Sequence, residues 1–362
     1  RAAAALGRTD EARSIVNEAL SIAITIPDTQ FIICEKSEAL TAIAKIVSEF
    51  GMTEEALSII NDAIASVRKF PKDRYWARVV AFVAIAKVLS ELGKTEEALN
   101  ILNEAVDIAG TIYDQNDKSE ALVAIAEAAA EVGKTKEAIR IVKKTLVLAK
   151  KLTDKRYKSR SLPGIAKALA ALGKTRKAMR IVNRSIKMAR GLIKGVDDDE
   201  KAFIGIAKTL AILGKTEETI KIIHDIFLVV GHLSSGYEYV RSSSHADCVK
   251  ILAELSANRQ SMSLLNEAIA VAETIHYNFD KLPALLAVAK ALAEFGKTEE
   301  ALNWVNKAFA CVCAIEEAKE RSDGVSVLID EILVTFGRAE ETMVRQAYQE
   351  VNEAVDEIER KM

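Results

Sequence analysis

Residues 93–99 read Gly-Lys-Thr-Glu-Glu-Ala-Leu, and this short stretch decides the fold of the chain. Closely similar stretches begin at Gly51, Gly133, Gly173, Gly214 and Gly296, and looser versions begin at Gly7, Ser256 and Gly337. Successive starting points lie 40 to 44 residues apart in a chain of 362 residues. A period this constant predicts an array of about nine repeated units.

Apolar residues on both sides of the stretch have helical spacing. Residues 84–89 read Ala-Ile-Ala-Lys-Val-Leu, and residues 99–105 read Leu-Asn-Ile-Leu-Asn-Glu-Ala. Apolar positions three and four residues apart indicate amphipathic helices, so each unit is predicted as helix, tight turn, helix. We expect the glycine to end the first helix in a left-handed conformation, and the threonine two residues later to cap the second helix.

Seven positions of the unit around Gly93 carry a family pattern of large apolar, small and glycine residues. They are Ile85, Ala86, Leu89, Gly93, Ala98, Leu102 and Ala105. In these positions the chain resembles the tetratricopeptide family, although its period exceeds the family's repeat of about 34 residues. The family's first-helix tryptophan and terminal proline are absent. The resemblance implies an all-α solenoid with a right-handed superhelix, which serves as a scaffold for proteins, peptides or larger assemblies.

We expect one tetratricopeptide-like solenoid over residues 1–362, with a basic segment at 134–194 and a C-terminal capping helix at about 339–362. Repeat units cannot bury their apolar faces alone, so the ends of an array need caps. Only half a unit precedes Gly7, and the chain opens on Arg1 without an initiator methionine. We therefore expect the natural protein to extend further at its N-terminus.

The composition argues against several classes of protein. The four cysteines, Cys34, Cys248, Cys311 and Cys313, lack the spacing of a disulfide framework or a zinc site, and we expect buried packing for the last two. No apolar run approaches the roughly 18 residues of a membrane span. These features predict a soluble, cytoplasmic protein without a membrane span.

No pattern of catalytic residues is present. The four histidines, His224, His232, His245 and His276, have no metal-ligand spacing and no recognisable nucleophile beside them. Residues 197–200 read Asp-Asp-Asp-Glu, which is typical of the acidic start of a helix. We expect no enzymatic activity, no cofactor and no metal.

Charge is segregated along the chain. Residues 134–194 contain 20 Lys or Arg but only two acidic residues, Glu137 and Asp154, whereas the whole chain has 50 basic and 52 acidic residues. The remaining residues therefore hold 30 basic and 50 acidic side chains. The net charge of −2 conceals one strongly basic region.

Helical spacing places these cations on one face of two successive second helices, which we expect to lie side by side. Pro163 favours a helix start near Ser161, which predicts a basic loop before it. The predicted anion-binding residues of the two helices and the loop are Lys136, Arg140, Lys143, Lys144, Lys150, Lys151, Lys155, Arg156, Lys158, Arg160, Arg176, Arg180, Arg184, Lys187, Arg190 and Lys194.

Like charges four residues apart destabilise a helix, so this surface favours an anionic partner over a passive solvated face of thermophile-like composition. Structured RNA or a ribonucleoprotein such as a ribosomal subunit is the leading interpretation, and it predicts contacts to phosphates rather than sequence readout. The alternative is a protein–protein adaptor without nucleic acid, or a self-associating scaffold such as a homodimer, that uses the concave surface and the basic face for acidic peptides or its own copies. In either case protein partners are expected at the acidic flanks or the concave face. An anionic membrane surface comes last.

A second candidate contact lies where the repeat pattern weakens, between Val230 and Asp247. The preceding helix is apolar nearly all round, and a polar loop with two tyrosines is expected to follow. The predicted protein-contact residues are Phe227, Leu228, Tyr237 and Tyr239. An exposed apolar spot of this kind is typical of a protein contact or of self-association.

Overall fold

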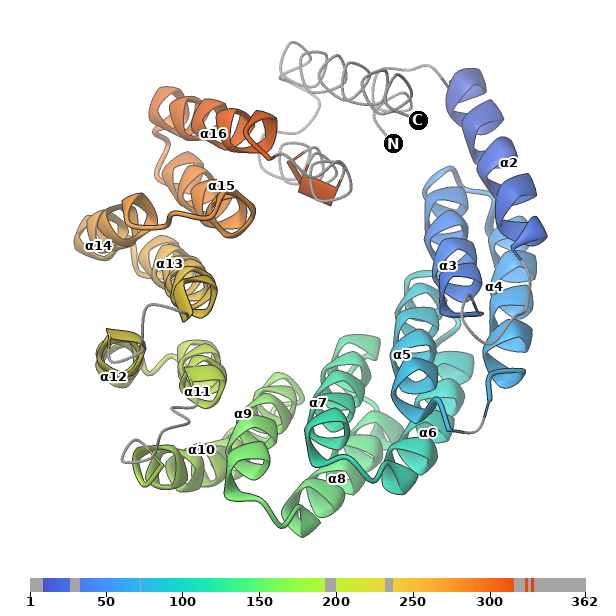
Figure 1. Ribbon diagram of the computed structural model, residues 1–362, viewed down its shortest axis with the longest axis horizontal. Coiled ribbons are helices and arrows are strands. Elements are labelled where there is room, and N and C mark those ends of the chain that lie inside the picture. The colour runs from blue at the N-terminus through green and yellow to red at the C-terminus, as the bar shows by residue number, and fades with distance from the viewer. Residues whose placement is uncertain are drawn as a thin grey trace. The chain divides into compact units, whose positions relative to one another are not determined.

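The computed structural model describes residues 9–26, 33–71, 73–192, 200–231, 237–315, 323–324 and 327–328. In this part of the chain Figure 1 shows helices throughout and no strand. The helices are α2 (Thr9–Thr25), α3 (Ile33–Glu49), α4 (Thr53–Arg68), α5 (Tyr75–Glu91), α6 (Thr95–Thr111), α7 (Gln115–Val132), α8 (Lys136–Lys151), α9 (Lys155–Ala171), α10 (Thr175–Arg190), α11 (Glu200–Ile212), α12 (Thr216–Gly231), α13 (Glu238–Arg259), α14 (Met262–Glu273), α15 (Asn278–Glu294) and α16 (Thr298–Cys313). The predicted all-α solenoid is confirmed.

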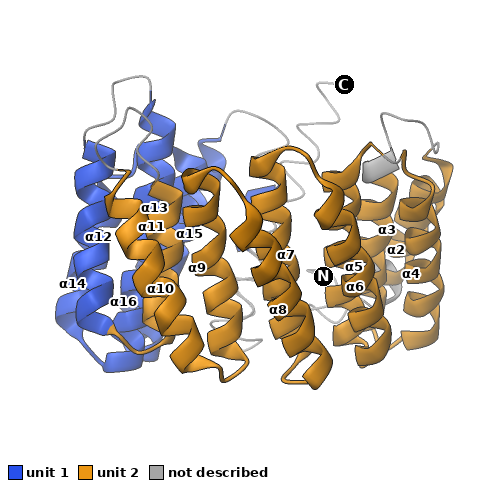
Figure 2. Cartoon of the chain, turned by 90° about the horizontal axis from the view of Figure 1, so that it is seen from below, with its two compact units in different colours: residues 1–12, 216–362 blue, residues 13–215 orange. Residues whose placement is uncertain are grey.

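The chain divides into two compact units, shown in separate colours in Figure 2. One unit comprises residues 13–215, and the other comprises residues 216–362 together with residues 1–12. The single array over residues 1–362 stays a prediction. The turns expected at Gly7 and Gly337, and the capping helix at 339–362, lie outside the described residues.

The unit of residues 13–215 is built on a stack of first helices. Helix α3 packs on α5, α5 on α7, α7 on α9, and α9 on α11, while α4, α6, α8 and α10 each pack on the first helix before them. Phe82, Leu122 and Ile165 are almost completely buried in this stack. Each unit thus covers the apolar face of its neighbour, as repeat stacking requires.

The unit that begins at Thr216 follows the same scheme. Helix α13 packs on α15, α14 packs on α13, and α16 packs on α15, while α12 also contacts α13. Leu285, Leu292 and Trp304 belong to its core. First helices again form the stack, with second helices against them.

The turn between the two helices of a repeat is a Schellman motif. At Gly93, φ is +75°, the Gly93 N–H donates to the Ser90 carbonyl (3.0 Å), and the Lys94 N–H donates to the Leu89 carbonyl (2.8 Å). The same pair of hydrogen bonds occurs at Gly51, Gly173, Gly214 and Gly296. Glycine is required because a side chain strains a residue at positive φ.

The predicted threonine caps are wrong at most of these turns. The N-cap of α6 is Lys94, and the caps of α4, α6, α10 and α16 make no side-chain hydrogen bond. The Schellman turn places the residue after glycine at the N-cap, so the threonine becomes the first helical residue. Only at Gly133, where φ is +133° and that hydrogen-bond pair is not formed, does Thr135 accept the Ala138 N–H (3.0 Å).

The turn predicted to begin at Ser256 lies four residues later. Ser256 is buried within α13, and Gln260 takes the left-handed conformation with φ +50°. The polar loop expected between Val230 and Asp247 is also shorter than predicted, because α12 continues to Gly231 and α13 already begins at Glu238. Ser242 and Ser244 of that stretch are buried helical residues.

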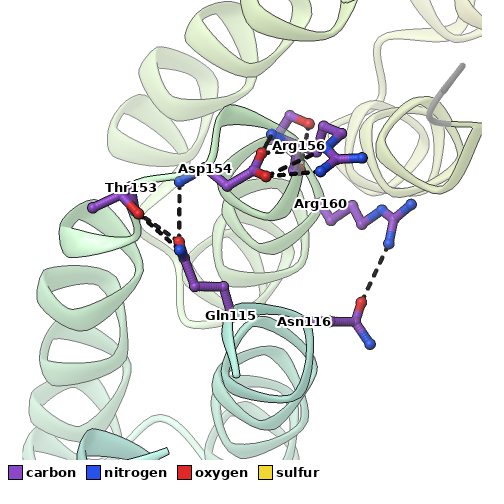
Figure 3. Close-up of polar contacts among 7 residues, drawn as sticks. Gln115, Asn116, Thr153, Asp154, Arg156 and Arg160 are labelled. Atoms are coloured by element: carbon purple, nitrogen blue, oxygen red, sulfur yellow. Dashed lines mark hydrogen bonds and ion pairs between the residues drawn. The ribbon is translucent and has the colours of Figure 1, made fainter. Parts of the chain in front are cut away.

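The expected basic loop before Ser161 is helical, since α9 begins at Lys155 and contains Pro163. Figure 3 shows why the helix starts early. The Asp154 carboxylate accepts the Arg156 N–H (2.8 Å), and the Gln115 side-chain oxygen accepts the backbone N–H groups of Thr153 (2.8 Å) and Asp154 (3.0 Å). A capped start held by α7 outweighs the helix-breaking tendency of the proline.

Close packing explains why proline and glycine occur inside α9. A Cβ atom added at Gly164 would lie 2.5 Å from a methyl carbon of Val123 on α7. A Cβ atom added at Gly205 on α11 would lie 3.2 Å from Pro163. Pro163-Gly164 is therefore a packing site between three first helices rather than a helix start.

Candidate functional site

Helix α10 carries the most complete basic face. Its buried side consists of Ala178, Ile181, Val182, Ser185 and Ala189. Its exposed side carries Arg176, Arg180, Arg184, Lys187 and Arg190. The helix contains no acidic residue, so these charges are not balanced along its own length.

Helix α8 carries the second basic face, and two of its cations, Arg140 and Lys144, already donate to the side-chain oxygen of Asn103. Arg140 donates its Nε to Glu137 (2.8 Å), and it also contacts the side-chain oxygen of Asn103 on α6 (3.0 Å). Hydrogen bonds from Arg140 and Asn103 lower the pKa of Glu137 to about 2. Lys136, Lys143, Lys150 and Lys151 are exposed, whereas Lys144 is half-buried.

The two basic helices do not pack directly on each other, contrary to the expected side-by-side arrangement. Helix α8 packs on α6, α7 and α9, whereas α10 packs on α9 and α11 (Figure 1). Lys177 of α10 is near enough to α8 to feel its charges: burial, followed by the charges of Lys143 and Lys150, lowers the pKa of Lys177. Helical spacing did not single out Lys177, since it lies at the edge of the apolar face of α10.

The cations of the first turns of α9 have partners within the chain. The guanidinium group of Arg156 bonds to the Asp154 carboxylate (3.0 Å), and that of Arg160 donates to the Asn116 oxygen (3.2 Å), as Figure 3 shows. Both guanidinium carbons lie 5.6 Å from the centre of the Tyr157 ring. Lys155 is exposed and Lys158 is half-buried, while Lys194 lies outside the described residues. These arginines hold local structure and are less available to a partner.

A groove between α6 and α8 is the feature that sequence reasoning missed. It has a volume of about 450 Å³, and Val106, Val147 and Leu148 give it an apolar floor. Val147 is 54% exposed although it lies between basic residues of α8. The remaining lining residues are Asp107, Gly110, Arg140, Lys143 and Lys144. The groove therefore combines apolar surface with a mostly basic rim.

Three of the four residues of the second candidate contact are exposed. Leu228 is 54% exposed and Tyr239 is 61% exposed, and Tyr237 is exposed as well. Phe227 is half-buried, because its ring packs edge-on against His245 with 5.5 Å between ring centres. Tyr239 makes a similar contact with Tyr277 at 6.2 Å. A protein contact at these four residues stays a prediction.

Two further observations concern the described part of the chain. It contains no group of three or more His, Cys, Asp or Glu side chains placed to hold a metal ion. None of its helices is both long enough and apolar enough to cross a membrane.

The expected burial of two cysteines is confirmed for Cys311, which is buried, and is wrong for Cys313, which is exposed.

Comparison with known proteins finds one family model that matches part of the chain. The family model described as "Tetratricopeptide repeat" matches residues 79–112, which cover most of α5 and all of α6. The chain is a tetratricopeptide-like helical repeat protein. The match covers one repeat, and repeats of this family generally serve as non-catalytic scaffolds. No curated protein matches the chain.

Solved structures resemble the tetratricopeptide-like chain at low identity. Ton1535 from Thermococcus onnurineus NA1 is 18% identical, covers 87% of this chain and 84% of its own, and has a TM-score of 0.33. NprR in complex with its cognate peptide NprX is 13% identical, with coverages of 98% and 86% and a TM-score of 0.37. A Rap protein complexed with Competence and Sporulation Factor is 11% identical, with coverages of 98% and 94% and a TM-score of 0.38.

Proposed function

We propose that the chain is a non-catalytic interaction scaffold that binds an acidic, amphipathic segment of a protein partner along α8. The apolar side chains of the segment occupy the groove between α6 and α8, which we call the α8 groove. The carboxylates of the bound segment face the cations of α8 and α10. The observation that carries the proposal is the apolar floor beside Lys143 and Lys144, in which Val147 is exposed, Leu148 is half-buried and Val106 is buried.

The shape and charge of the α8 groove favour a helical peptide. At a rise of about 1.5 Å per residue, the 16 residues of α8 extend over about 24 Å. A partner helix lying in a groove of this kind presents apolar residues at positions i, i+3, i+4 and i+7. Carboxylates on the flanks of such a helix would meet Lys143 of α8 and the arginines of α10.

The structured RNA or ribonucleoprotein expected from the charge pattern stays a prediction. An RNA duplex offers phosphates and sugars to a protein, and it has nothing to fill an apolar groove floor. Tyr157, the one aromatic residue in the basic segment, is flanked by Arg156 and Arg160 and is only partly exposed. The apolar floor is the reason for preferring a protein partner.

Another hollow, of about 420 Å³, lies along α13 and α15, and its lining selects less strongly for the charge of a partner. Lys250 and Lys290 line it together with Glu254 and Glu294, so its charges are mixed. Mixed charges favour neither an acidic nor a basic partner, whereas the mostly basic rim of the α8 groove favours an acidic one. We therefore place the acidic segment on α8.

Fluorescence anisotropy with three labelled probes tests the proposal. The probes are an acidic amphipathic peptide of about 20 residues, a scrambled peptide of the same composition, and an RNA duplex of about 20 base pairs. We expect the amphipathic peptide to bind at least about tenfold more tightly than the scrambled one, because only the former presents an apolar stripe.

Two variants separate the parts of the site. Val147→Glu should weaken binding of the amphipathic peptide about tenfold or more, and Ile212→Glu is its matched control because Ile212 is a similarly exposed apolar residue at 50%. Replacing Arg176, Arg180, Arg184 and Lys187 by glutamate should weaken binding of both peptides. The affinity of the variant for these peptides should not depend more steeply on salt than that of the unmodified chain. If the RNA duplex binds more tightly than the peptide and Val147→Glu leaves that binding unchanged, the proposal is wrong and the RNA prediction is favoured.

A further inference from the structure

A polar pocket of about 370 Å³ lies in the unit that begins at Thr216, apart from every residue of the α8 groove. Helix α13 supplies Glu238, Arg241, Ser242 and His245, and the segment that leads from α14 into α15 supplies Thr274, His276 and Tyr277. Its volume falls in the range of sites for small molecules, about 300–1,000 Å³. Every lining residue has a polar side chain, which is unusual beside the alanine- and leucine-rich core of this fold.

Ser242 provides the clearest sign of a ligand site. The residue is only 4% exposed, it lines the pocket, and its hydroxyl group has no hydrogen-bond partner. A buried hydroxyl without a partner costs about 1–3 kcal/mol, so such groups are normally satisfied. A ligand with an acceptor oxygen in the pocket would satisfy it.

The other lining groups favour an anion. Arg241 offers guanidinium donors, and its charge reaches the imidazole of His245, whose pKa is lowered by burial first and then by Arg241 and His276. The first residue of α13 is Glu238, and Tyr277 directly precedes α15, so the positive ends of two helices border the pocket. Neither N-cap residue, Tyr237 or Tyr277, makes a side-chain capping hydrogen bond. Glu238 opposes this field, but it is exposed and therefore screened by solvent.

The hydrogen bonds of Thr274 fix the form of His245. The Thr274 hydroxyl donates its proton to the Val271 carbonyl (2.7 Å), so at its contact with His245 Nδ1 (3.2 Å) it can only accept. The neutral imidazole therefore carries its proton on Nδ1, and Nε2 is the atom that gains a proton when the ring becomes charged. An anion nearby would favour that protonation.

We propose that this pocket binds the oxyanion group of a small ligand, a phosphate or a carboxylate, with Arg241 and Ser242 as its main donors. His245 becomes an additional donor as it takes up a proton, and His276 lines the same pocket. The Phe227 ring, which packs edge-on against His245, keeps that imidazole in place. This site is independent of the acidic segment proposed for α8.

Histidine side-chain NMR on the full chain tests the site, because the chain has only four histidines. Inorganic phosphate and acetate are titrated separately, with sodium chloride holding the ionic strength constant. We expect the His245 and His276 signals to shift and saturate with a dissociation constant of about 1 mM or lower. The His245 pKa should rise at saturation, whereas His224, exposed on α12 beside Glu267, should keep its signal.

Three variants connect the shifts to the pocket. Arg241→Gln and Ser242→Ala should each weaken binding about tenfold or more, and Arg259→Gln, at the other end of α13, is the matched control. Ser242→Ala removes a buried hydroxyl without a partner, so the variant should unfold at the same or a higher temperature, and lost binding cannot be ascribed to unfolding.

The two anions separate the kinds of ligand. Tighter binding of phosphate indicates a phosphorylated ligand, and equal or tighter binding of acetate indicates a carboxylate ligand. Shifts that rise without saturation, or that are the same in Arg241→Gln and Ser242→Ala as in the unmodified chain, would overturn the proposal.

Discussion

The glycine at the repeat turn is set by backbone conformation rather than by space. At Gly93, φ is +75°, yet an added Cβ would meet nothing within 4 Å. Gly110 near the end of α6 also has open space, but its φ is not in the positive range. The two positions therefore separate backbone strain from steric clash.

We predict opposite effects of alanine at these two glycines. Gly93→Ala should lower the free energy of unfolding by about 1 kcal/mol or more, because the left-handed conformation strains a Cβ. Gly110→Ala should raise it by about 0.5–1 kcal/mol, because alanine is the better helix residue. Urea unfolding followed by circular dichroism measures both, and equal signs for the two variants would contradict the argument.

Glu137 joins α8 to Asn103 of α6, and this contact should depend on pH. Its pKa is lowered from 4.5 to about 2, so its contribution to stability is complete above pH 4.5 and is lost as the pH falls toward 2. We predict that Glu137→Gln lowers the free energy of unfolding at pH 7 by less than about 1 kcal/mol, because the pair is largely solvated.

Urea unfolding at a series of pH values measures the effect of Glu137→Gln. The unmodified chain and the variant should differ at pH 7 and converge near pH 2. A difference that is constant across this range would show that the ionised carboxylate is not its cause.

At the scale of the element, α9 shows how tertiary packing overrides a local preference. Pro163 alone favours a helix start near Ser161, but the Asp154 cap and the contacts of Gln115 begin the helix six residues earlier, at Lys155. The neighbouring Gly164 then allows α9 to approach Val123 on α7. The contacts of Gln115 and Val123 come from residues about 40 positions away, so no local pattern could reveal them, whereas the Asp154 cap is local.

We predict that Gly164→Ala lowers the free energy of unfolding by about 1–3 kcal/mol, because the new methyl group overlaps Val123. Val123→Ala should relieve that overlap, so the double variant should lose less than the sum of the two single changes. Thermal unfolding of the unmodified chain, the two single variants and the double variant gives the coupling free energy between the two positions. Additive losses would mean that the two residues do not meet.

At the scale of the whole molecule, the separation of charge matters more than its sum. The chain has a net charge of −2 and a sequence pI of about 6.2, yet residues 134–194 hold 20 of its 50 basic residues and only two acidic ones. Opposite charges far apart along a chain create distinct fields at ordinary ionic strength, where screening extends over about 8–10 Å.

We predict that the chain binds both anion-exchange and cation-exchange resins at pH 8 and low salt. Replacing Arg176, Arg180, Arg184 and Lys187 by glutamate should abolish retention on the cation exchanger and strengthen retention on the anion exchanger, because only the basic face changes. The elution salt concentration measures both effects. Cation-exchange retention that survives the four changes would show that α10 is not the dominant basic surface.

The sequence by itself determined the helices, the period and most of the turns, because these depend on neighbouring residues. Glycine at positive φ and apolar spacing of three and four are local properties, and they identify repeats without knowledge of contacts. The same spacing correctly separated the exposed arginines of α10 from its buried side. Local patterns failed where caps and packing partners decide, as at the start of α9 and at Gln260.

Only the tertiary structure decided which surfaces are concave. The α8 groove joins Val106 of α6 to Val147 of α8, and the pocket of α13 joins Ser242 to Tyr277 beyond the next helix. Residues that far apart in the sequence meet because whole helices pack, and packing depends on the shapes of many side chains at once. Charge could be read from the order of the residues, whereas concavity could not.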